Sequence, residues 1–397
     1  MTTRLLVVAM ANSPHLHRWV RAIADDSLTI VVFPALQTPQ QPDAVVRLAE
    51  LSDALPTGVY TLSADDVRSQ DAAEIDRRWH YEPRTHHFVS PEALASADRL
   101  ATAIARFRPH LVHSMETQVA GYLVAELVRR NGKQQPWIHS TWGSDIALYG
   151  RMRAHQSRLR SMFRDVDVHL ADCPRDVALA RALGYRGRDM PALPSSGGVD
   201  VDDLAGLARQ LPSERRRIMV KGYHNWAGRN LLALSALMLI ADELADYEIV
   251  IPKADSALRE WAGIMSNRTA LKVRVLPDMP SEVDAIAELA EARLLISLSI
   301  SDGLATMVLE AMAVGAFPIQ SKAGCSHELF GDGVGGLVVP ANDTRAVADA
   351  ILRALRDDAL VDDAATQNLA TVRQRWDRRT NGALVRDLYR ESRTAAQ

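Results

Sequence analysis

Short apolar runs alternate with longer segments of helical pattern along most of the chain, and this alternation constrains the possible folds more than any other feature. Residues 5–9 and 28–33 are the first two runs, and a helical pattern ending near Ala24 lies between them. Strands separated by helices in this way pair in parallel and are joined by right-handed crossovers. The sequence therefore predicts an α/β fold built on parallel sheets. Further strands are expected at residues 110–113, 137–141 and 166–171.

A polar region near residues 202–216 interrupts the alternation, which restarts at residues 217–223. A chain of 397 residues can hold two domains with ordinary cores, so we interpret this region as the domain joint. Strands are then expected at residues 247–251, 272–276, 294–298, 317–320 and 336–339, and helices at residues 229–243, 344–356 and 376–392. We predict a first domain at residues 1–205, a second at residues 206–375 and a terminal helical segment at residues 376–397.

Composition and charge exclude several classes of protein. The chain is 47% hydrophobic with a formal net charge of −3, which argues against a protein that binds nucleic acid. No stretch approaches the roughly 18 consecutive apolar residues of a membrane span. The first apolar run, residues 5–11, is too short for a signal-peptide core with its cleavage region. We therefore expect a cytoplasmic protein, and the sequence does not indicate its oligomeric state.

Residues 151–164 form a basic segment with two possible roles. The segment carries five arginines and one histidine and no acidic residue. As a helix it would set a basic face against an apolar one, and such a face can dock on anionic lipid head groups. A solvated helix face balanced by nearby acids explains the same pattern equally well. Peripheral contact with the inner face of a membrane is one of these two possibilities.

The segment from residue 294 to residue 319 combines an apolar strand, a small polar turn and a helix that ends at Gly315. Free backbone N–H groups and the helix dipole converge where such a helix begins, so the turn is a candidate anion site. Asp302 and Glu310 flank it, eight residues apart, or roughly 12 Å along a helix axis. That span matches a sugar–diphosphate–ribose ligand, with Asp302 at the sugar and Glu310 at a diol. The alternative is an ordinary buried helix, in which an unpaired Glu310 would be costly.

This segment resembles the signature of family-4 retaining glycosyltransferases of the GT-B fold: an acid, a glycine, six variable residues and then Glu-Ala-Met-Ala. Gly303 and residues 310–313 match the signature, and Asp302 stands where Glu is usual. Other segments resemble family motifs in the expected order: residues 12–19, 107–113, 142–145, 195–200 and 324–328. The resemblance implies two Rossmann-like domains facing across a cleft, with a C-terminal helix crossing back to the first domain.

The resemblance also implies an activity. A retaining glycosyltransferase moves a sugar from a nucleotide-sugar donor, bound by the second domain, to an acceptor on the first. The acceptor would be a glycan, a lipid-linked compound or a small molecule, in the biosynthesis of a glycan, glycolipid or other glycoconjugate. The family picture is front-face attack, with the leaving phosphate helping to take the acceptor's proton. No cofactor is expected beyond the donor itself.

The departing diphosphate needs positive charge, because its negative charge grows as the glycosidic bond breaks. Metal-free members of the family use Lys or Arg after the first strand of the second domain, where this chain has Lys221 and Arg229. We expect these two with Asp302 to be catalytic, with no metal, although Lys221 could instead be a flanking charge and Arg229 a solvent-facing residue. The remaining donor-binding candidates are Glu310, Gly303, Leu304, Ala305, Thr306 and Gly222.

The acceptor or sugar side has its candidates in the first domain. They are Ser13, His15, His113, Trp142, Gly143 and Asp145. Trp142 stands where many family members carry His, which removes a hydrogen-bond donor to the transferred sugar and indicates a different sugar or acceptor. His113 is expected at the carboxyl end of a strand, where α/β proteins bind ligands; the alternative is a buried structural histidine.

Two other functions remain open from the sequence. A nucleotide-sugar epimerase could use the same fold, because a fold alone does not determine a reaction. An inactive nucleotide-sugar-binding protein would suit the departures at Asp302, Trp142 and Cys325. The base and sugar of the donor, and the acceptor, are not indicated.

Overall fold

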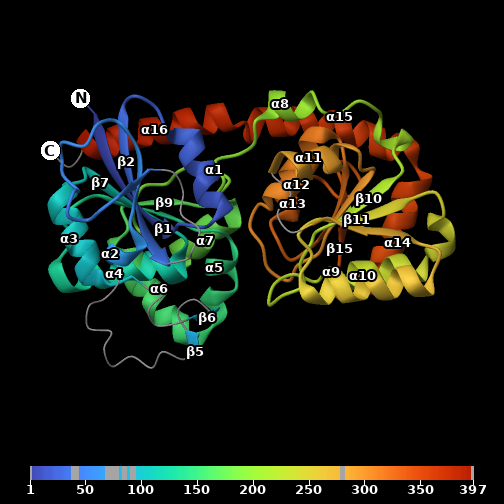
Figure 1. The fold of residues 1–397 in the computed structure, drawn as a ribbon, viewed down its shortest axis with the longest axis horizontal. Helices are drawn as coiled ribbons and strands as arrows, with labels where there is room; N and C mark the ends of the chain where they lie inside the picture. Colours follow the sequence, from blue (N-terminus) through green and yellow to red (C-terminus); the bar gives the residue numbers. More distant parts are fainter. Residues whose placement is uncertain are drawn as a thin grey trace. The chain divides into compact units, whose positions relative to one another are not determined.

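A computed structural model describes residues 2–36, 44–67, 80–82, 87–89, 95–277 and 282–394. The chain divides into two compact units (Figure 1). One comprises residues 1–197 together with residues 379–397, and the other comprises residues 198–378. This division falls between Gly197 and Gly198, earlier than the boundary that we expected after residue 205.

The first unit is built on a seven-stranded sheet in the order β3-β4-β2-β1-β7-β8-β9, in which all paired strands are parallel. The strands are β1 (Thr3–Met10), β2 (Leu28–Leu36), β3 (Val45–Val46), β4 (Gly58–Leu62), β7 (Leu111–Met115), β8 (Trp137–Ser140) and β9 (Val168–Leu170). The helices are α1 (Pro14–Ile23), α2 (Ala64–Val67), α3 (Ala97–Phe107), α4 (Tyr122–Asn131), α5 (Ser144–Ala147), α6 (Arg153–Asp165), α7 (Pro174–Ala182) and α16 (Arg378–Thr394). A π-helical turn (Thr117–Gly121), a 3-10 turn (Tyr149–Arg151) and an antiparallel pair, β5 (His80–Glu82) with β6 (His87–Val89), complete this unit.

Two hydrophobic cores cover the two faces of this sheet. Side chains of β1 alternate between them, because successive residues of a strand point to opposite faces: Leu6 and Val8 join α3, α4 and α6, whereas Leu5 and Val7 join α1 and α16. The Tyr389 hydroxyl of α16 accepts a hydrogen bond from Trp19 Nε1 at 3.1 Å. The C-terminal helix is therefore an integral part of the first unit.

The second unit is built on a six-stranded sheet in the order β12-β11-β10-β13-β14-β15, again with parallel pairs throughout. The strands are β10 (Arg217–Val220), β11 (Glu248–Ile251), β12 (Lys272–Val275), β13 (Leu294–Ser297), β14 (Phe317–Ser321) and β15 (Leu337–Val339). The helices are α8 (Val201–Ala205), α9 (Asn230–Leu239), α10 (Ser256–Arg268), α11 (Glu282–Ala290), α12 (Thr306–Val314), α13 (Ser326–Leu329), α14 (Thr344–Arg356) and α15 (Asp358–Arg375). In this unit α9 packs against α10 and α14, and α12 packs against α11 and α15 (Figure 1). The two parallel sheets confirm the predicted α/β class.

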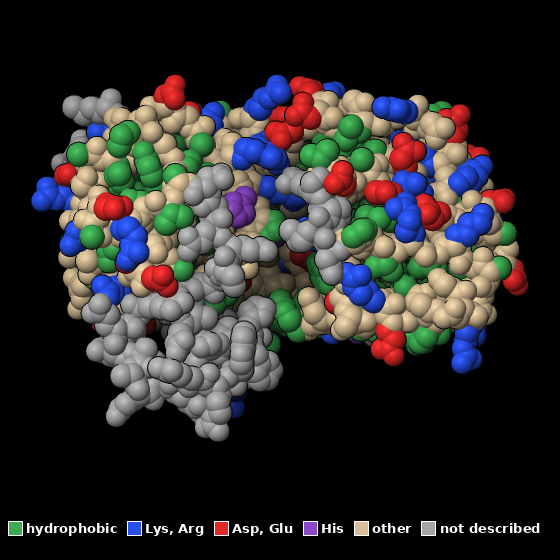
Figure 2. Space-filling model, viewed as in Figure 1, with side chains coloured by type: hydrophobic (Ala, Val, Ile, Leu, Met, Phe, Trp, Pro, Cys, Tyr) green, Lys and Arg blue, Asp and Glu red, His purple; other side chains and the backbone are tan. Residues whose placement is uncertain are grey.

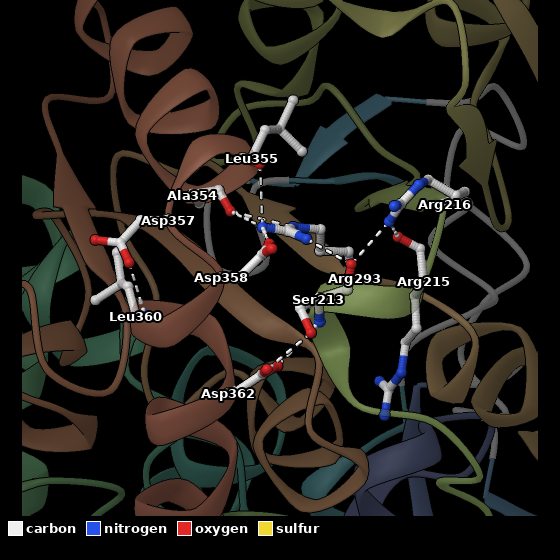
Figure 3. Close-up of polar contacts among 10 residues, drawn as sticks. All are labelled: Ser213, Arg215, Arg216, Arg293, Ala354, Leu355, Asp357, Asp358, Leu360 and Asp362. Carbon is white, nitrogen blue, oxygen red and sulfur yellow. Dashed lines mark hydrogen bonds and ion pairs between the residues drawn. The ribbon is translucent and has the colours of Figure 1, made fainter.

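A buried arginine fixes the amino end of β13. The Arg293 side chain is 1% exposed and donates to the carbonyls of Ala354 (2.8 and 3.1 Å), Leu355 (3.1 Å) and Ser213 (2.8 Å) and to Asp358 Oδ1 (2.7 Å) (Figure 3). The first two carbonyls belong to the last turn of α14, which has no partners for them within the helix. Arg293 thus ties the start of β13 to the end of α14. The other end of β13 leads into the turn at residues 298–305, which precedes α12.

Strand order decides which loops become neighbours. Because β10 lies beside β13, their carboxyl ends bring Lys221 and the turn at residues 298–305 together. Strand limits also correct two expectations. β7 extends to Met115, so His113 lies in the middle of the strand and not at its end. The expected strand at residues 217–223 already ends at Val220.

No helix within the described ranges has both the length and the apolar character needed to cross a bilayer. On the face drawn in Figure 2, acidic and basic side chains are interspersed and hydrophobic ones occur in small groups.

Candidate functional site

The loop from β10 to α9 is held close to the neighbouring β11–α10 loop. A Cβ on Gly222 would lie 1.5 Å from the carbonyl oxygen of Pro252, so the backbones approach more closely than any side chain allows. The Gly222 carbonyl accepts from Asp255 N at 3.0 Å, and Lys221 N donates to Ile296 O at 2.9 Å. These contacts fix the backbone on both sides of the Lys221 side chain.

Lys221 and Asp302 form an ion pair, with 3.0 Å between Nζ and Oδ2. The Lys221 side chain is 10% exposed and that of Asp302 is 23% exposed. Nζ also lies 4.7 Å from the centre of the Tyr223 ring, a cation–π geometry. Burial alone would lower the pKa of Lys221, but Asp302 and Tyr223 outweigh it and raise that pKa. Lys221 therefore carries a permanent, nearly buried positive charge.

The turn between β13 and α12 has the geometry of an anion site. Ser321 Oγ braces it by accepting from Ser299 N (2.8 Å) and donating to Ser299 O (2.6 Å). The N-cap residue of α12 is Ala305, whose side chain cannot cap the first-turn N–H groups. The Thr306 hydroxyl is buried and has no hydrogen-bond partner among the described residues. Glu310 lies buried one turn further along α12.

Several other buried polar atoms beside this turn lack partners among the described residues. Both amide atoms of Gln320 and the hydroxyls of Ser301 and Ser326 are in this state. A Cβ on Gly324 would lie 3.4 Å from Asp302 Cβ and 3.7 Å from Gln320 Nε2, so these residues surround one place. Leaving buried polar groups unpaired costs stability, so each invites an explanation; a polar ligand would supply the missing partners.

The Arg229 side chain, which we expected to be catalytic, contacts carbonyls of its own loop. Its Nη1 donates to the carbonyls of Asn225 (2.8 Å) and Gly228 (2.7 Å), and Nη2 donates to Trp226 O (3.4 Å). In this structure the guanidinium braces its own loop. It can bind an anion only by exchanging these carbonyls for it.

In the first unit, the β1–α1 and β8–α5 loops meet through aromatic side chains. Ser13 caps α1 by accepting from His15 N at 3.3 Å. The His15 ring lies 5.0 Å from the Trp142 ring, measured between centroids and tilted by 45°. Trp142 Nε1 is buried and has no hydrogen-bond partner in the described ranges. The structure thus brings Ser13, His15 and Trp142 to one edge of the sheet.

Asp145 joins two loops instead of presenting a free carboxylate. Its Oδ1 accepts from Trp142 N (2.9 Å), and its Oδ2 accepts from both the backbone N (3.2 Å) and the hydroxyl (2.9 Å) of Thr117. Burial raises the pKa of Asp145 to about 7. Gly143, the N-cap of α5, lies between Trp142 and this carboxylate. Asp145 is therefore better described as a residue that positions Trp142.

Glu116, which the sequence analysis did not single out, precedes the π-helical turn with a φ of +75°. This φ is unfavourable for a residue other than glycine, and such strain clusters at functional sites. Its carboxyl oxygens accept from Gln118 N (2.6 Å) and Val119 N (2.7 Å). Burial, reinforced by Asp145, raises the pKa of Glu116 to about 8. Nothing in the sequence pattern indicated a left-handed backbone here.

His113 is completely buried. Its Nδ1 lies 2.8 Å from the Tyr389 hydroxyl and its Nε2 lies 2.7 Å from Ser140 Oγ. Burial lowers the pKa of His113 to about 3, so the ring is neutral. Both nitrogens are engaged in joining β7, β8 and α16, which leaves none for a substrate.

Comparison with known families gives two matches. Residues 223–357 match the family described as glycosyl transferases group 1, and residues 59–171 match the family described as glycosyl transferase 4-like. The first match contains the turn at residues 298–305 and α12, and the second contains β7, β8 and α6.

Two curated proteins are similar to parts of the chain. One is a phosphatidyl-myo-inositol mannosyltransferase from Mycolicibacterium smegmatis, 26% identical over 190 residues, or 47% of this chain and 48% of that protein. The other is a D-inositol 3-phosphate glycosyltransferase from Saccharomonospora viridis, 28% identical over 219 residues, or 54% of this chain and 44% of that protein. The matched region thus spans about half the length of each relative.

Solved structures resemble the whole chain. Sucrose-phosphate synthase from Thermosynechococcus elongatus has a TM-score of 0.71 at 16% identity, covering 99% of this chain and 100% of that one. Trehalose 6-phosphate synthase from Burkholderia multivorans has a TM-score of 0.72 at 16% identity, covering 100% of both. HepE from Anabaena, solved with UDP-glucose, has a TM-score of 0.65 at 14% identity, covering 98% and 99%. At these identities the likeness shows the fold alone, which is GT-B.

Proposed function

The chain belongs to the group 1 glycosyltransferases of the GT-B fold, and from that premise we propose that it transfers a sugar from a nucleotide-sugar donor to an acceptor. The observation that carries the proposal is the turn before α12, where the first N–H groups of the helix have no side-chain cap and can bind an anion. The nearly buried Lys221 and the unpaired polar atoms of Thr306 and Gln320 lie beside this turn. Both family matches and the solved complex of HepE with UDP-glucose support this reading.

The donor would bind with its diphosphate at the amino end of α12. Uncapped N–H groups and the helix dipole favour an anion there, and the Thr306 hydroxyl is available to donate. Lys221 supplies the positive charge that stabilises the leaving group in the transition state. Glu310, further along α12, would hold the ribose hydroxyls. Asp302 and Gln320 would then face the transferred sugar.

Transfer with retention of anomeric configuration, and without a metal, is part of the proposal. Support for retention is the match of residues 302–313 to the family signature. Support for metal independence is the presence of Lys221 and Arg229 as cations on the same loop. The anomeric proton signal of the first product tests retention. Activity in excess chelator tests metal independence, and loss of activity with rescue by Mg²⁺ or Mn²⁺ would contradict it.

The first unit would bind the acceptor at the edge where His15 and Trp142 meet. The acids near this edge, Asp145 and Glu116, are already hydrogen-bonded to backbone groups. A neutral, hydroxyl-bearing acceptor suits such an edge better than a cationic one. The names of the curated relatives contain inositol, so inositol and its phosphate and lipid derivatives belong in the acceptor screen.

The test begins with donors. A ligand that binds only the native state raises thermal stability, by about 2.7 kcal/mol at a hundred times its Kd. We expect at least one nucleoside diphosphate, and its sugar, to raise the melting temperature of the chain. Lys221→Met should lose this rise, whereas Lys272→Met, at an exposed position on β12, should keep it.

Acceptors are then screened with the stabilising donor, by mass spectrometry of products. Transfer to an acceptor supports the proposal. Conversion of the donor's sugar without an acceptor would indicate an epimerase, and binding without any turnover would indicate an inactive binding protein. Either of these results refutes glycosyl transfer.

A further inference from the structure

We propose that the first unit docks on an anionic lipid bilayer through a basic face formed by α6 and the end of α4. What we call the α6 basic face consists of Arg153, Arg158, Arg160 and Arg164 of α6, Arg151 of the preceding 3-10 turn and Arg129 of α4, all of which are exposed. This surface is separate from the donor and acceptor residues discussed above, so the inference stands or falls independently of the proposed activity.

Helical geometry aligns three of these arginines. Arg153, Arg160 and Arg164 lie at positions i, i+7 and i+11 of α6, which fall on one side of a helix. The line they form is about 17 Å long at 1.5 Å per residue. The opposite side of α6 packs into the core through Leu159, Met162 and Phe163. The arginine line is therefore held in place by buried packing.

A hollow of about 350 Å³ opens between α6 and α4, on a different side of α6 from this line. Arg158 and Ser161 of α6 and Arg129 of α4 are among its lining residues. Arg158 lies over the Tyr122 ring, 5.7 Å from its centre, which orients the guanidinium toward α4. Two arginines and a hydroxyl in one hollow can receive a phosphate group that projects from a surface.

Within the described part of the chain, no acidic side chain neutralises these charges. None of the six arginines makes an ion pair with a described residue. Glu126, the carboxylate that lines the hollow, is already paired with Arg130. The only acid within α6 is Asp165, its last residue. An extended anionic surface is the complementary partner of such a face.

The observations favour a bilayer over nucleic acid. The exposed side of α6 carries Arg, Ala and Ser and no aromatic residue on which a base could stack. The chain as a whole is acidic, with a net charge of −3 and a pI near 6.5. The same side has no large apolar residue to insert between lipids, so contact would be electrostatic and sensitive to salt.

Vesicle co-sedimentation of the full chain tests the proposal. We expect binding to phosphatidylcholine vesicles that contain phosphatidylglycerol and none to phosphatidylcholine alone. Binding should fall sharply between ionic strengths of about 0.1 M and 1 M, because the Debye length shortens from about 10 Å to 3 Å. The variant Arg153→Gln/Arg160→Gln/Arg164→Gln should partition on the order of a hundredfold more weakly, with an unchanged melting temperature.

A matched variant controls for net charge. Arg209→Gln/Arg268→Gln/Arg345→Gln removes the same charge from exposed positions of the second unit and should bind vesicles like the unmodified chain. Equal loss in both variants, or no binding of the unmodified chain to anionic vesicles, overturns the proposal. Binding of duplex RNA or DNA through the three α6 arginines, without binding to vesicles, overturns it as well.

Discussion

Replacing Asp302 with Asn tests whether the Asp302 carboxylate is the anion that neutralises Lys221 until a donor phosphate binds beside it. The substitution keeps the shape of the side chain and removes its charge. Lys221 is nearly buried and pairs with Asp302 at 3.0 Å, so the variant leaves its positive charge beside a neutral amide and the Tyr223 ring, with no charged partner. Breaking one side of a fully buried pair costs about 3–5 kcal/mol. Because Asp302 is 23% exposed, we expect the smaller cost of about 2–3 kcal/mol.

The expected loss of stability can be measured by calorimetry. For a domain of 150–250 residues, each kcal/mol lowers the melting temperature by about 2–4 °C, so the second unit should melt about 4–12 °C lower. Asp349→Asn, an exposed acid on α14, removes the same charge and should shift melting by less than about 2 °C. A melting temperature of Asp302→Asn equal to that of this control would show that the ion pair contributes nothing.

Nucleotide binding gives the more specific readout. A diphosphate would restore an anion to Lys221, so the nucleoside diphosphate should bind Asp302→Asn at least threefold more tightly than the unmodified chain. Turnover of the intact donor should nevertheless fall, because the contact of Asp302 with the sugar is lost. Titration calorimetry with Asp302→Asn, Lys221→Met and the double variant closes a thermodynamic cycle. Weaker nucleotide binding in Asp302→Asn, together with unchanged binding in Lys221→Met, would refute the reasoning.

Four further predictions concern single side chains. Glu310→Gln should weaken nucleotide binding at least about tenfold, because charge-assisted hydrogen bonds to ribose are lost; an unchanged Kd by calorimetry would reject the role of Glu310. Arg229→Ala should lower kcat more than it raises KM, with partial rescue by Arg229→Lys; a change in KM alone would make Arg229 a binding residue. Burial raises the pKa of Glu116 to about 8, so the folded state keeps a proton that the unfolded state releases above about pH 4.5, and the free energy of unfolding falls as the pH rises toward 8. Between pH 5 and pH 8, the stability of Glu116→Gln in denaturant titrations should therefore gain more than about 1 kcal/mol relative to the unmodified chain. A difference in stability that stays constant with pH would contradict this. Arg293→Met should destabilise the second unit by about 2–4 kcal/mol, because the carbonyls of Ala354 and Leu355 lose their donor, while Ser213 O keeps the hydrogen bond from Arg216. Asp358→Asn, at a side chain that is 70% exposed, should cost less than about 1 kcal/mol; equal effects in thermal melts would show that the ion pair dominates.

The sequence predicted the parallel sheets and the turn before α12 because both depend on local pattern. Apolar runs of strand length, separated by helical periods, indicate crossovers wherever they occur. Gly315 ends α12 with a φ of +81°, as its position after the last apolar turn indicated. The turn at Asp302 and the helix that contains Glu310 were likewise predicted from local sequence alone.

The partners of individual side chains were not readable in the same way. That Lys221 meets Asp302 follows from β10 lying beside β13, and strand order is a property of topology. The carbonyls that occupy Arg229 depend on the exact path of one loop. His113 was expected at a strand end because we placed that strand at residues 110–113, whereas β7 continues through Ser114 and Met115. Gln320 was not predicted as a site residue, because the sequence does not show whether the one amide in the apolar run of β14 finds hydrogen-bond partners.

The two ends of β13 show why the ligand belongs at one of them. At the amino end, Arg293 provides a donor to each of three backbone carbonyls and to a carboxylate, so the polar groups gathered there are paired. At the carboxyl end, Ser301, Thr306 and Gln320 are also buried, and each has a polar side-chain atom without a partner among the residues that the structure describes. A sequence that can satisfy one end of a strand gains nothing in stability from leaving the other end unpaired. The unpaired groups, the uncapped helix and the charge of Lys221 therefore have a common explanation in a polar, anionic ligand that completes this end of the sheet.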